Sequence, residues 1–469
     1  MIRIDVLPDD VLLDIFDYYM AMDPSIRNKV RIEEWQLLIH VCRRWRSLVF
    51  GSPSRLNLRL YCTPETPAKY TLDAWPALPL IIAGSLALTP VMDNIIPALG
   101  QSNRVREVLF SGLLDWTFEN VLAAMQVPFP ELTDLVLYSI GINPPPITDS
   151  FLGGSAPRLR IIDLSGIPCP GLPKLLLSAT HLVHLNLSNV PHSGYISPEV
   201  MVTCLSVLSR LESLILEFKS PESRPDREGR SLPLSKRFIL PALDNLHFKG
   251  VTEYLEQFVT HIDTPKLNQM RITFFDQINF DIPRLAQFIN CTQTLRALDE
   301  AHVRLNPWTA SIRFRYRKSK TSFGYLRIDI PCEEPDWQIS SIEQVCNSSL
   351  HSFTTVEDLY IDHRYSRLVW EDYAIENNIW LQLLLPFTVV KNLYLSKEFA
   401  PSIAVALYEG RTTEVLANLQ NIFVEMLEPS GPFQESIGGF VAARQHRVSN
   451  HAIAISVWDK SSDQPDPEW

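Results

Sequence analysis

The chain has 469 residues, of which 46% are hydrophobic, so it is long enough to bury a large core. Its formal net charge of −11 at pH 7 disfavours nucleic-acid binding as a main role. Only 17 residues are glycine, and neither a GxSxG motif nor a P-loop is present, so the sequence predicts neither a catalytic centre nor a cofactor. An enzyme is the least supported hypothesis.

Cysteine usage indicates an intracellular protein, in the cytoplasm, the nucleus or both. The seven cysteines are scattered without a CxxC or CxxH pair, which favours reduced thiols over a zinc site, and Met1–Asp5 carries no signal-peptide pattern. The uncharged stretch 74–92 contains three prolines, each of which costs about 3 kcal/mol in a helix interior. We therefore expect a buried strand at 78–83 and a helix at 90–99, and no membrane partner.

The first sixty residues are predicted to form a small helical domain. Proline and acidic residues in Leu7-Pro8-Asp9-Asp10 favour the start of a helix. Two apolar stripes at helical spacing follow, and they consist of Val11, Leu12, Ile15, Phe16 and Tyr19, and of Trp35, Leu38, Ile39, Cys42, Trp45 and Val49. A domain of this size buries only about 60% of its unfolded surface. Some of these side chains should therefore face the rest of the chain or a partner.

Apolar residues at positions 1, 4 and 6 of a short unit recur from Val105 to the end of the chain. The units begin at Val105, Leu132, Leu159, Leu182, Leu211, Leu243, Leu267, Val356, Val390 and Leu419. This spacing is typical of leucine-rich repeats, in which each strand-plus-helix unit must stack on its neighbours to bury its apolar side. We predict strands near 107–110, 134–137, 161–164, 184–187, 213–218, 245–248, 269–273, 358–361, 392–395 and 421–425, with neighbouring strands paired and helices on the outer side.

The less regular segments give further predictions. Alternation of Leu56, Leu58 and Leu60 predicts a strand, and 61–104 is interpreted as a capping and transition segment. The gap between Leu295 and Val356 suits two degenerate units, with a strand at 326–330. A final helix at 434–448 and a closing strand at 452–458 end the solenoid of residues 105–458. Residues 459–469 are interpreted as a flexible tail.

Two surfaces are candidates for binding a protein target. Arg313, Arg315 and Arg317 alternate with apolar residues, which predicts either a site for an acidic or phosphorylated partner or a solvated strand that blunts a sheet edge. On the exposed face of the late repeats we place Tyr360, Asp362, Tyr394 and Phe423, where aromatic residues would form one contiguous patch. His181, His184 and His192 are interpreted as surface residues of the repeats and not as metal ligands.

Two N-terminal segments carry a family resemblance. Leu7-Pro8-Asp9-Asp10-Val11-Leu12-Leu13-Asp14-Ile15-Phe16 resembles the opening LPxExLxxIF of the F-box, and Val41-Cys42-Arg43-Arg44-Trp45-Arg46-Ser47-Leu48 resembles its second half, VCRxWRxL. The chain therefore resembles F-box/leucine-rich-repeat proteins of fungal type, with an F-box domain at 1–60. The implied fold class is α/β: an all-helical F-box followed by an irregular leucine-rich-repeat solenoid with inner parallel strands and outer helices.

The resemblance also implies partners and a role. The F-box would dock a Skp-family adaptor, and through it a cullin, by way of Leu7, Pro8, Val11, Leu12, Ile15, Phe16, Val41, Cys42 and Trp45. The repeats would hold an unknown protein target, so the chain would be the non-catalytic substrate-recognition subunit of an SCF-type ubiquitin ligase. The alternative is a leucine-rich-repeat scaffold that is not linked to degradation.

Overall fold

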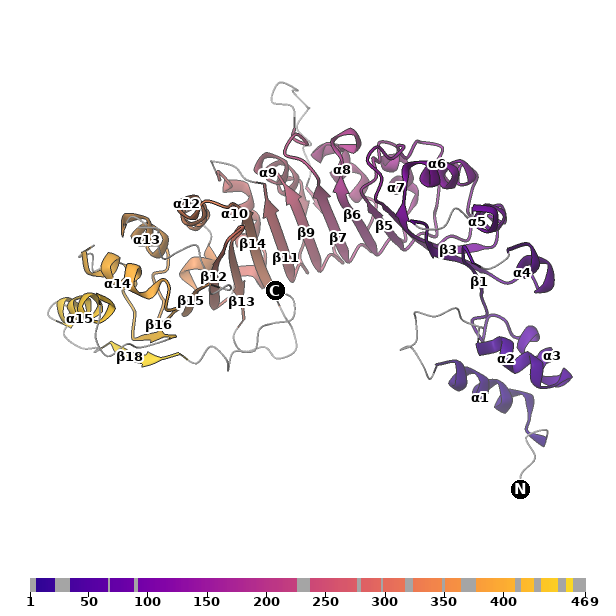
Figure 1. The fold of residues 1–469 in the computed structure, drawn as a ribbon, viewed down its shortest axis with the longest axis horizontal. Helices are drawn as coiled ribbons and strands as arrows, with labels where there is room; N and C mark the ends of the chain where they lie inside the picture. Colours follow the sequence, from indigo (N-terminus) through magenta and orange to yellow (C-terminus); the bar gives the residue numbers. More distant parts are fainter. Residues whose placement is uncertain are drawn as a thin grey trace. The chain divides into compact units, whose positions relative to one another are not determined.

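The computed structural model describes residues 6–21, 34–65, 68–87, 92–225, 237–275, 280–296, 298–316, 324–347, 351–363, 377–409, 415–425, 432–445 and 453–458. The chain divides into two compact units, Met1–Leu182 and Val183–Trp469. Strands and helices alternate along most of both units, as Figure 1 shows. The predicted α/β class is confirmed, and the described strands form open, mostly parallel sheet.

The first unit begins with a helical module, as predicted. Its helices are α1 (Asp9–Ala21), α2 (Glu34–Val41) and α3 (Arg43–Gly51). Leu12, Phe16, Ile39 and Val49 are buried between them, because each helix turns one apolar stripe inward. The predicted strand from Leu56 is wrong at its start: 53–57 form turns, and the strand begins only at Leu60.

A five-stranded parallel sheet follows in the described part of the first unit. Its strands are β1 (Leu60–Cys62), β2 (Leu80–Ser85), β3 (Val105–Leu113), β4 (Asp134–Ser139) and β5 (Ile161–Ser165), paired in chain order. The intervening α-helices are α4 (Ala68–Ala74), α5 (Met92–Leu99) and α6 (Asp115–Ala124), a 3-10 helix at Phe151–Gly154 lies between β4 and β5, and α7 (Leu172–Ser178) follows β5. The strand and helix predicted within 74–99 are thus confirmed as β2 and α5, and the predicted side-by-side pairing of β4 and β5 is confirmed as well.

The second unit contains a larger, mostly parallel sheet. Its strands are β6 (His184–Val190), β7 (Ser213–Phe218), β9 (Asn245–Gly250), β11 (Gln269–Phe274), β12 (Glu300–Asn306), β13 (Thr309–Arg315), β14 (Tyr325–Pro331), β15 (Asp358–His363), β16 (Asn392–Leu395), β17 (Asn421–Val424) and β18 (Ala454–Val457). β8 (Phe238–Ile239) and β10 (Ile262–Asp263) pair in a small separate sheet. Each strand predicted after residue 182 coincides with one of these strands.

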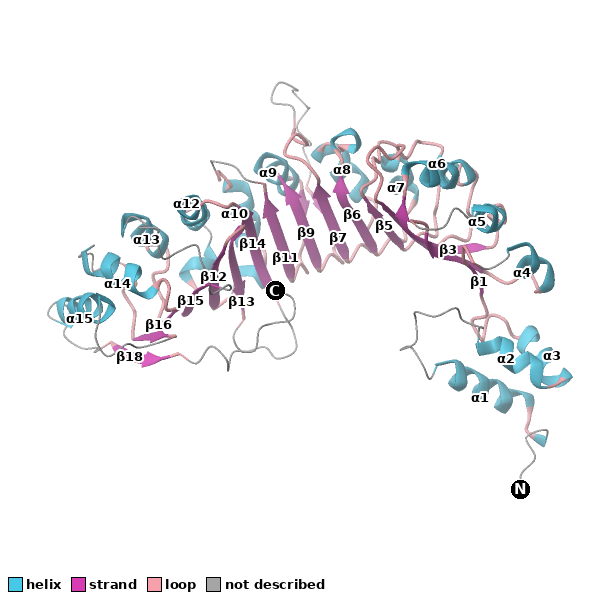
Figure 2. Cartoon of the chain, in the orientation of Figure 1, coloured by secondary structure: helices cyan, strands magenta, loops and turns pink. Residues whose placement is uncertain are grey.

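The helices of the second unit pack against one side of its strands, as Figure 2 shows. They are α8 (Pro198–Leu205), α9 (Thr252–Thr260), α10 (Pro283–Cys291), α11 (Gln293–Arg296), α12 (Pro335–Cys346), α13 (Asn377–Leu384), α14 (Ala400–Glu409) and α15 (Pro432–Gln445). Ser197 caps α8 by accepting a hydrogen bond from the Val200 N–H. Residues 446–448 of the predicted final helix lie outside the described residues, as do 459–469.

The prediction of two degenerate repeats between 295 and 356 is wrong. The sheet order there is β11-β14-β13-β12-β15, with β13 antiparallel to both of its neighbours. After β11 the chain therefore skips the positions of β14 and β13 to form β12. It then fills the gap with β13 and β14, and α12 carries it back past β12 to β15. Trp308 lies in the two-residue turn between β12 and β13, which is too short for a crossover helix. This antiparallel strand departs from the predicted all-parallel inner layer.

The core beneath β6, β7 and β9 contains a cluster of aromatic rings. Tyr254 on α9 is fully buried, and its ring lies 4.8 Å from Phe218 and 5.7 Å from Phe248. Its hydroxyl donates a hydrogen bond to the Ile196 carbonyl at 3.0 Å, and burial raises the pKa of this hydroxyl. One side chain thus joins the helix layer, the strands and the segment before α8.

Tyr254→Phe should lower the free energy of unfolding by about 1 kcal/mol, because the Ile196 carbonyl loses its buried donor. Tyr254→Ala should cost about 3–5 kcal/mol through the cavity that it leaves. Urea denaturation measures both, and Tyr18→Phe, at an exposed position on α1, serves as the matched control. Equal, small effects of the two Tyr254 substitutions would contradict this role.

Candidate functional site

The helical module presents an exposed apolar surface. Val11, Ile15 and Val41 are 37%, 41% and 59% exposed, and Pro8 is exposed beside them in sequence. Val11 and Ile15 lie four residues apart on α1, so they share one face of that helix. Exposed aliphatic side chains at this density, in so small a module, are typical of a surface that binds another protein.

Two of the nine predicted adaptor contacts are wrong, because Leu12 and Phe16 have no exposed surface. Both belong to the core of the module, where the Phe16 ring lies 4.7 Å from that of Trp45. Trp45 and Leu7 are half-buried, whereas Cys42 is exposed and its Sγ accepts the Trp45 N–H at 3.5 Å. The motif alone does not separate core residues from exposed contact residues, because both kinds lie within one run of apolar residues.

Polar contacts hold the module together and tie it to the sheet of the first unit. Arg44 donates from Nε to Asp9 at 3.0 Å and from Nη2 to the Leu7 carbonyl at 2.5 Å, which fixes the N-terminus of α1 against α3. The Trp35 indole N–H donates to the Arg59 carbonyl at 3.1 Å, and its ring lies 5.3 Å from that of Trp75. The sequence does not reveal these ties, although Trp35 belongs to the second apolar stripe and Arg44 to the segment Val41–Leu48.

The second candidate surface is a row of stacked rings on the side of the sheet opposite the helices. We name His302, Tyr360, Tyr394 and Phe423 the aromatic ladder. They occupy one register position on β12, β15, β16 and β17, with centroids 4.3, 4.1 and 4.6 Å apart and planes within 9° of parallel. The predicted contiguous patch of Tyr360, Tyr394 and Phe423 is confirmed, and His302 extends it.

The aromatic ladder is less open than predicted, because Trp458 packs on it. The Trp458 ring lies 5.7 Å from both Tyr360 and Tyr394, inclined by 60° and 68° to them. Trp458 is only 7% exposed, and the tyrosines and Phe423 are half-buried. The predicted closing strand accounts for this cover, since Trp458 follows β18 directly.

The prediction of Asp362 as an exposed contact is wrong. Asp362 is 4% exposed and accepts two hydrogen bonds from Arg304, from Nε at 2.8 Å and from Nη2 at 2.9 Å. Such a bidentate pair has little capacity left for an outside ligand. The register of β12 with β15 places these two residues opposite each other, and this pairing could not be read from positions 58 residues apart.

A polar row accompanies the aromatic ladder, and we name Asp358, Asn392 and Asn421 the amide ladder. Asn392 donates to Asp358 at 2.5 Å, and Asn421 donates to Asn392 at 2.7 Å. Each member immediately precedes the second apolar residue of its repeat, and this signal in the sequence was missed. These hydrogen bonds link the side chains of neighbouring strands on the face that carries the aromatic ladder.

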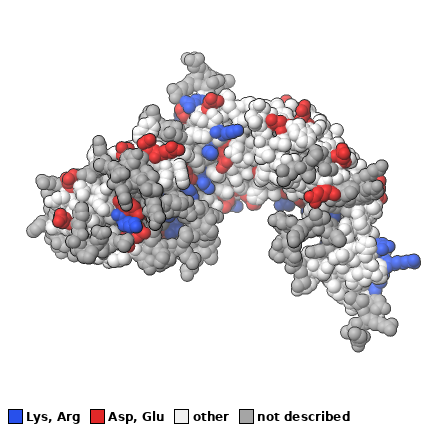
Figure 3. Space-filling model, in the orientation of Figure 1, with Lys and Arg blue, Asp and Glu red and all other residues white. Residues whose placement is uncertain are grey.

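The arginine strand is not a sheet edge, and its Arg313 is not exposed. β13 lies between β12 and β14, Arg313 is buried with its guanidinium 4.9 Å from the Tyr325 ring centroid, and Arg315 donates to Glu300 at 2.6 Å. Arg317 lies outside the described residues. On the face that Figure 3 presents, positive and negative groups of the described residues are interspersed. The sheet-edge interpretation is therefore wrong, the site for an acidic or phosphorylated partner loses Arg313 as an exposed contact, and the alternation itself is confirmed.

Arginines from three strands nevertheless meet in one row. Arg271, Arg327 and Arg313 share a register position on β11, β14 and β13, and Asp329 accepts from Arg271 at 3.3 Å and from Arg327 at 2.9 Å. His247 on β9 is next in this row. Burial, with repulsion from Arg271, Arg327 and Lys249, lowers the pKa of His247 to about 4, so its contact with Glu217 at 3.4 Å is not an ion pair at neutral pH.

His302 links the arginines to the aromatic ladder. Burial lowers its pKa even though its neighbour Glu300 attracts a proton to it. Burial acts to raise the pKa of Glu300, but hydrogen bonds from His302 and Arg315 outweigh that effect and lower it. A neutral imidazole donating to a charged carboxylate is the arrangement that these shifts favour.

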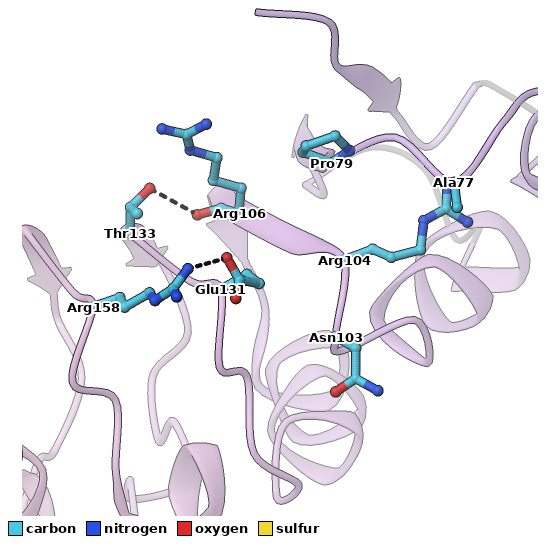
Figure 4. Close-up of a pocket in the computed structure, with 8 residues that line it drawn as sticks. All are labelled: Ala77, Pro79, Asn103, Arg104, Arg106, Glu131, Thr133 and Arg158. Atoms are coloured by element: carbon cyan, nitrogen blue, oxygen red, sulfur yellow. Dashed lines mark hydrogen bonds and ion pairs between the residues drawn. The ribbon is translucent and has the colours of Figure 1, made fainter. Parts of the chain in front are cut away.

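A cavity of about 300 Å³ lies in the first unit, at the N-terminal ends of β2 to β5 (Figure 4). Three arginines line it, but Arg158 pairs with Glu131, and Arg104 donates to the Leu78 carbonyl at 3.1 Å and to the Pro76 carbonyl at 3.2 Å. Because protein acceptors already engage two of these cations, the exposed apolar surface of the module and the aromatic ladder are the stronger candidates.

Comparison with known proteins does not identify what these surfaces bind. No protein-family model matches the chain, and no curated protein matches its sequence. Among the described helices, none is long and apolar enough to cross a membrane. Within the same residues, no group of three or more His, Cys, Asp or Glu side chains could hold a metal ion, and none of the seven cysteines forms a disulfide.

Acid should destabilise the fold through His247. Its pKa of about 4 lies below the ordinary value of 6.5, so between these pH values unfolding takes up a proton that the folded state excludes. The free energy of unfolding should fall by at most about 1.4 kcal/mol per pH unit in this window. His247→Gln should therefore lose less Tm than the wild type between pH 7 and pH 5.

Differential scanning calorimetry at both pH values measures this difference. His184→Gln is the control, because His184 is an exposed histidine on β6. If His247→Gln loses as much Tm as the wild type, His247 is not the source of the acid sensitivity.

Proposed function

We propose that the chain is the substrate-recognition subunit of an SCF-type ubiquitin ligase. The observation that carries the proposal is the N-terminal module, in which F-box-like motif residues divide into a buried set, Leu12 and Phe16, and an exposed set, Val11, Ile15 and Val41. The exposed set, with Pro8, would dock a Skp-family adaptor and through it a cullin. The chain would then contribute positioning and no bond chemistry.

The aromatic ladder supports the second half of the proposal. Tyr360, Tyr394 and Phe423 offer aromatic surface on rigid strands, which is the kind of surface that supplies anchor residues in protein interfaces. The competing basic surface is weaker, because Asp329, Glu300 and Asp362 already pair with its arginines. We infer that the target is held by stacking and apolar contact, not by its phosphate groups.

The adaptor interface is tested by Pro8→Ala/Ile15→Ala. Removal of two exposed contacts should abolish pulldown of a Skp-family adaptor and leave the near-UV circular dichroism unchanged, because neither side chain belongs to the core of the module. The matched control is Trp116→Ala/Val127→Ala, which removes two exposed apolar side chains elsewhere in the first unit. Undiminished adaptor binding by the Pro8/Ile15 variant would refute the main claim.

The target surface is tested by Tyr394→Ala against Arg271→Glu. With a target captured by affinity purification while ligase activity is blocked, Tyr394→Ala should weaken binding roughly thirtyfold, or about 2 kcal/mol. Arg271→Glu should change it little; this residue is chosen because its side chain is 40% exposed, whereas Arg313 is buried. Loss of the target with Arg271→Glu alone would favour an acidic or phosphorylated target instead.

Degradation separates the proposal from a scaffold that binds the adaptor without promoting ubiquitination. Under the proposal, deletion of the protein stabilises its captured target. If the target binds through Tyr394 but its half-life does not change when this protein is deleted, the chain is such a scaffold.

A further inference from the structure

Trp458 occupies the aromatic ladder in the way that a side chain of a bound partner would. Its ring contacts the rings of Tyr360 and Tyr394 at equal centroid distances of 5.7 Å. It is 93% buried, although the four residues of the strand before it are all exposed. Ile453 and Trp458 are therefore the two buried ends of a segment whose middle four residues are exposed.

The strand that carries Trp458 is weakly held. Among the described residues, β18 pairs only with β17, through hydrogen bonds such as Ala454 N–H to the Gln420 carbonyl and Trp458 N–H to the Val424 carbonyl, both at 2.8 Å. Ile455 and Val457 lie in register with the buried Ile422 and Val424 but are 38% and 62% exposed, so the inward side of this strand is only partly buried. An element with few buried contacts and exposed backbone bonds opens at low free energy.

We propose that β18 and Trp458 are an internal competitor for an extended peptide segment of the target. That segment would add in parallel to the edge of β17 that β18 occupies, and would place an aromatic side chain on the aromatic ladder. The inference rests on the proposed function, which makes the partner a protein target. It adds the feature of the target that would be recognised, which is an extended strand with an aromatic residue. It also adds a closed state, in which β18 and Trp458 cover the binding site of their own chain.

Peptide chemistry fits this surface better than a nucleotide base, which would also stack on tyrosine. Glu300, Asp358 and Asp362 flank the aromatic ladder in the adjacent register positions of β12 and β15. Arg304 and Arg315 already pair with Asp362 and Glu300, so the arginines beside the aromatic ladder offer little attraction to a phosphate backbone. The N–H and C=O groups that β17 would expose on loss of β18 are donors and acceptors at the spacing of an extended peptide main chain.

The test opens the site in the full chain. The Ala454 and Trp458 N–H groups donate to β17, and strand alternation assigns the same role to the Ser456 N–H, so Ser456→Pro removes a ladder bond. Ser456→Pro/Trp458→Ala is the opened variant. Val457→Pro is the matched control, because the Val457 N–H points away from β17.

The probe is a fluorescently labelled peptide, Ile-Ala-Ile-Ser-Val-Trp, which copies residues 453–458. Fluorescence anisotropy should show at least tenfold tighter binding to the opened variant than to the wild type or Val457→Pro. Replacement of the peptide's tryptophan by alanine should lose at least tenfold on the opened variant. Equal affinity for opened and closed chains, or no dependence on the tryptophan, would overturn the proposal.

A second measurement uses the wild-type chain and so does not depend on the folding of a variant. A tethered segment competes at an effective concentration of roughly millimolar. Millimolar peptide should therefore accelerate amide hydrogen exchange at 454–458 and leave α9 unchanged; unaltered exchange at 454–458 would refute displacement. Neither measurement contains the adaptor, so failure of adaptor pulldown by the wild type would remove the ligase role without affecting these results.

Discussion

The structure depends on the burial of the inward-facing side chains of the strands, in rows that each strand shares with the next. Leu135 lies opposite Ile162 in the first unit, Leu393 lies opposite Ile422 in the second, and all four are fully buried or nearly so. Side chains alternate along a strand, so a slip of one residue would turn every such leucine to the wrong face. This penalty fixes the register strongly, and the register then determines what the opposite face can contain.

The ladders on the opposite face follow from that register. Once Leu393 and Ile422 are aligned, Asn392 must lie opposite Asn421 and Tyr394 opposite Phe423. The rings stack at 4.6 Å because the spacing of the strands sets the spacing of equivalent side chains. The amide and aromatic ladders therefore require no separate scaffold: the apolar core positions them, and their own contacts add to the stability of the strands that carry them.

The inserted hairpin changes the chemistry of the face. Because β13 runs antiparallel between β12 and β14, Arg313 lies opposite Arg327 on one side and His302 on the other. Three arginines and two histidines thereby share one row, and buried carboxylates such as Asp329 and Glu300 partly neutralise it. The row ends where Tyr360 begins the aromatic part of the ladder, so one surface changes from charged to aromatic within the width of a strand.

The sequence by itself determined the elements that repeat. Apolar residues at positions 1, 4 and 6 predicted β3 to β7, β9, β11 and β15 to β17, because the same positions of each unit must be buried. The same periodicity placed Tyr360, Tyr394 and Phe423 on one face. The helical stripes predicted the N-terminal module, although they could not separate buried Leu12 from exposed Val11.

Only the tertiary structure decided which distant residues meet. Strand order and long connections between strands determine three features that the sequence did not predict. These are the burial of Asp362 against Arg304, the central position of β13 and the packing of Trp458 on the aromatic ladder. A local pattern specifies which side of a strand must be buried. It does not specify which strand lies alongside, because that choice is made by the summed packing of side chains far apart in the sequence.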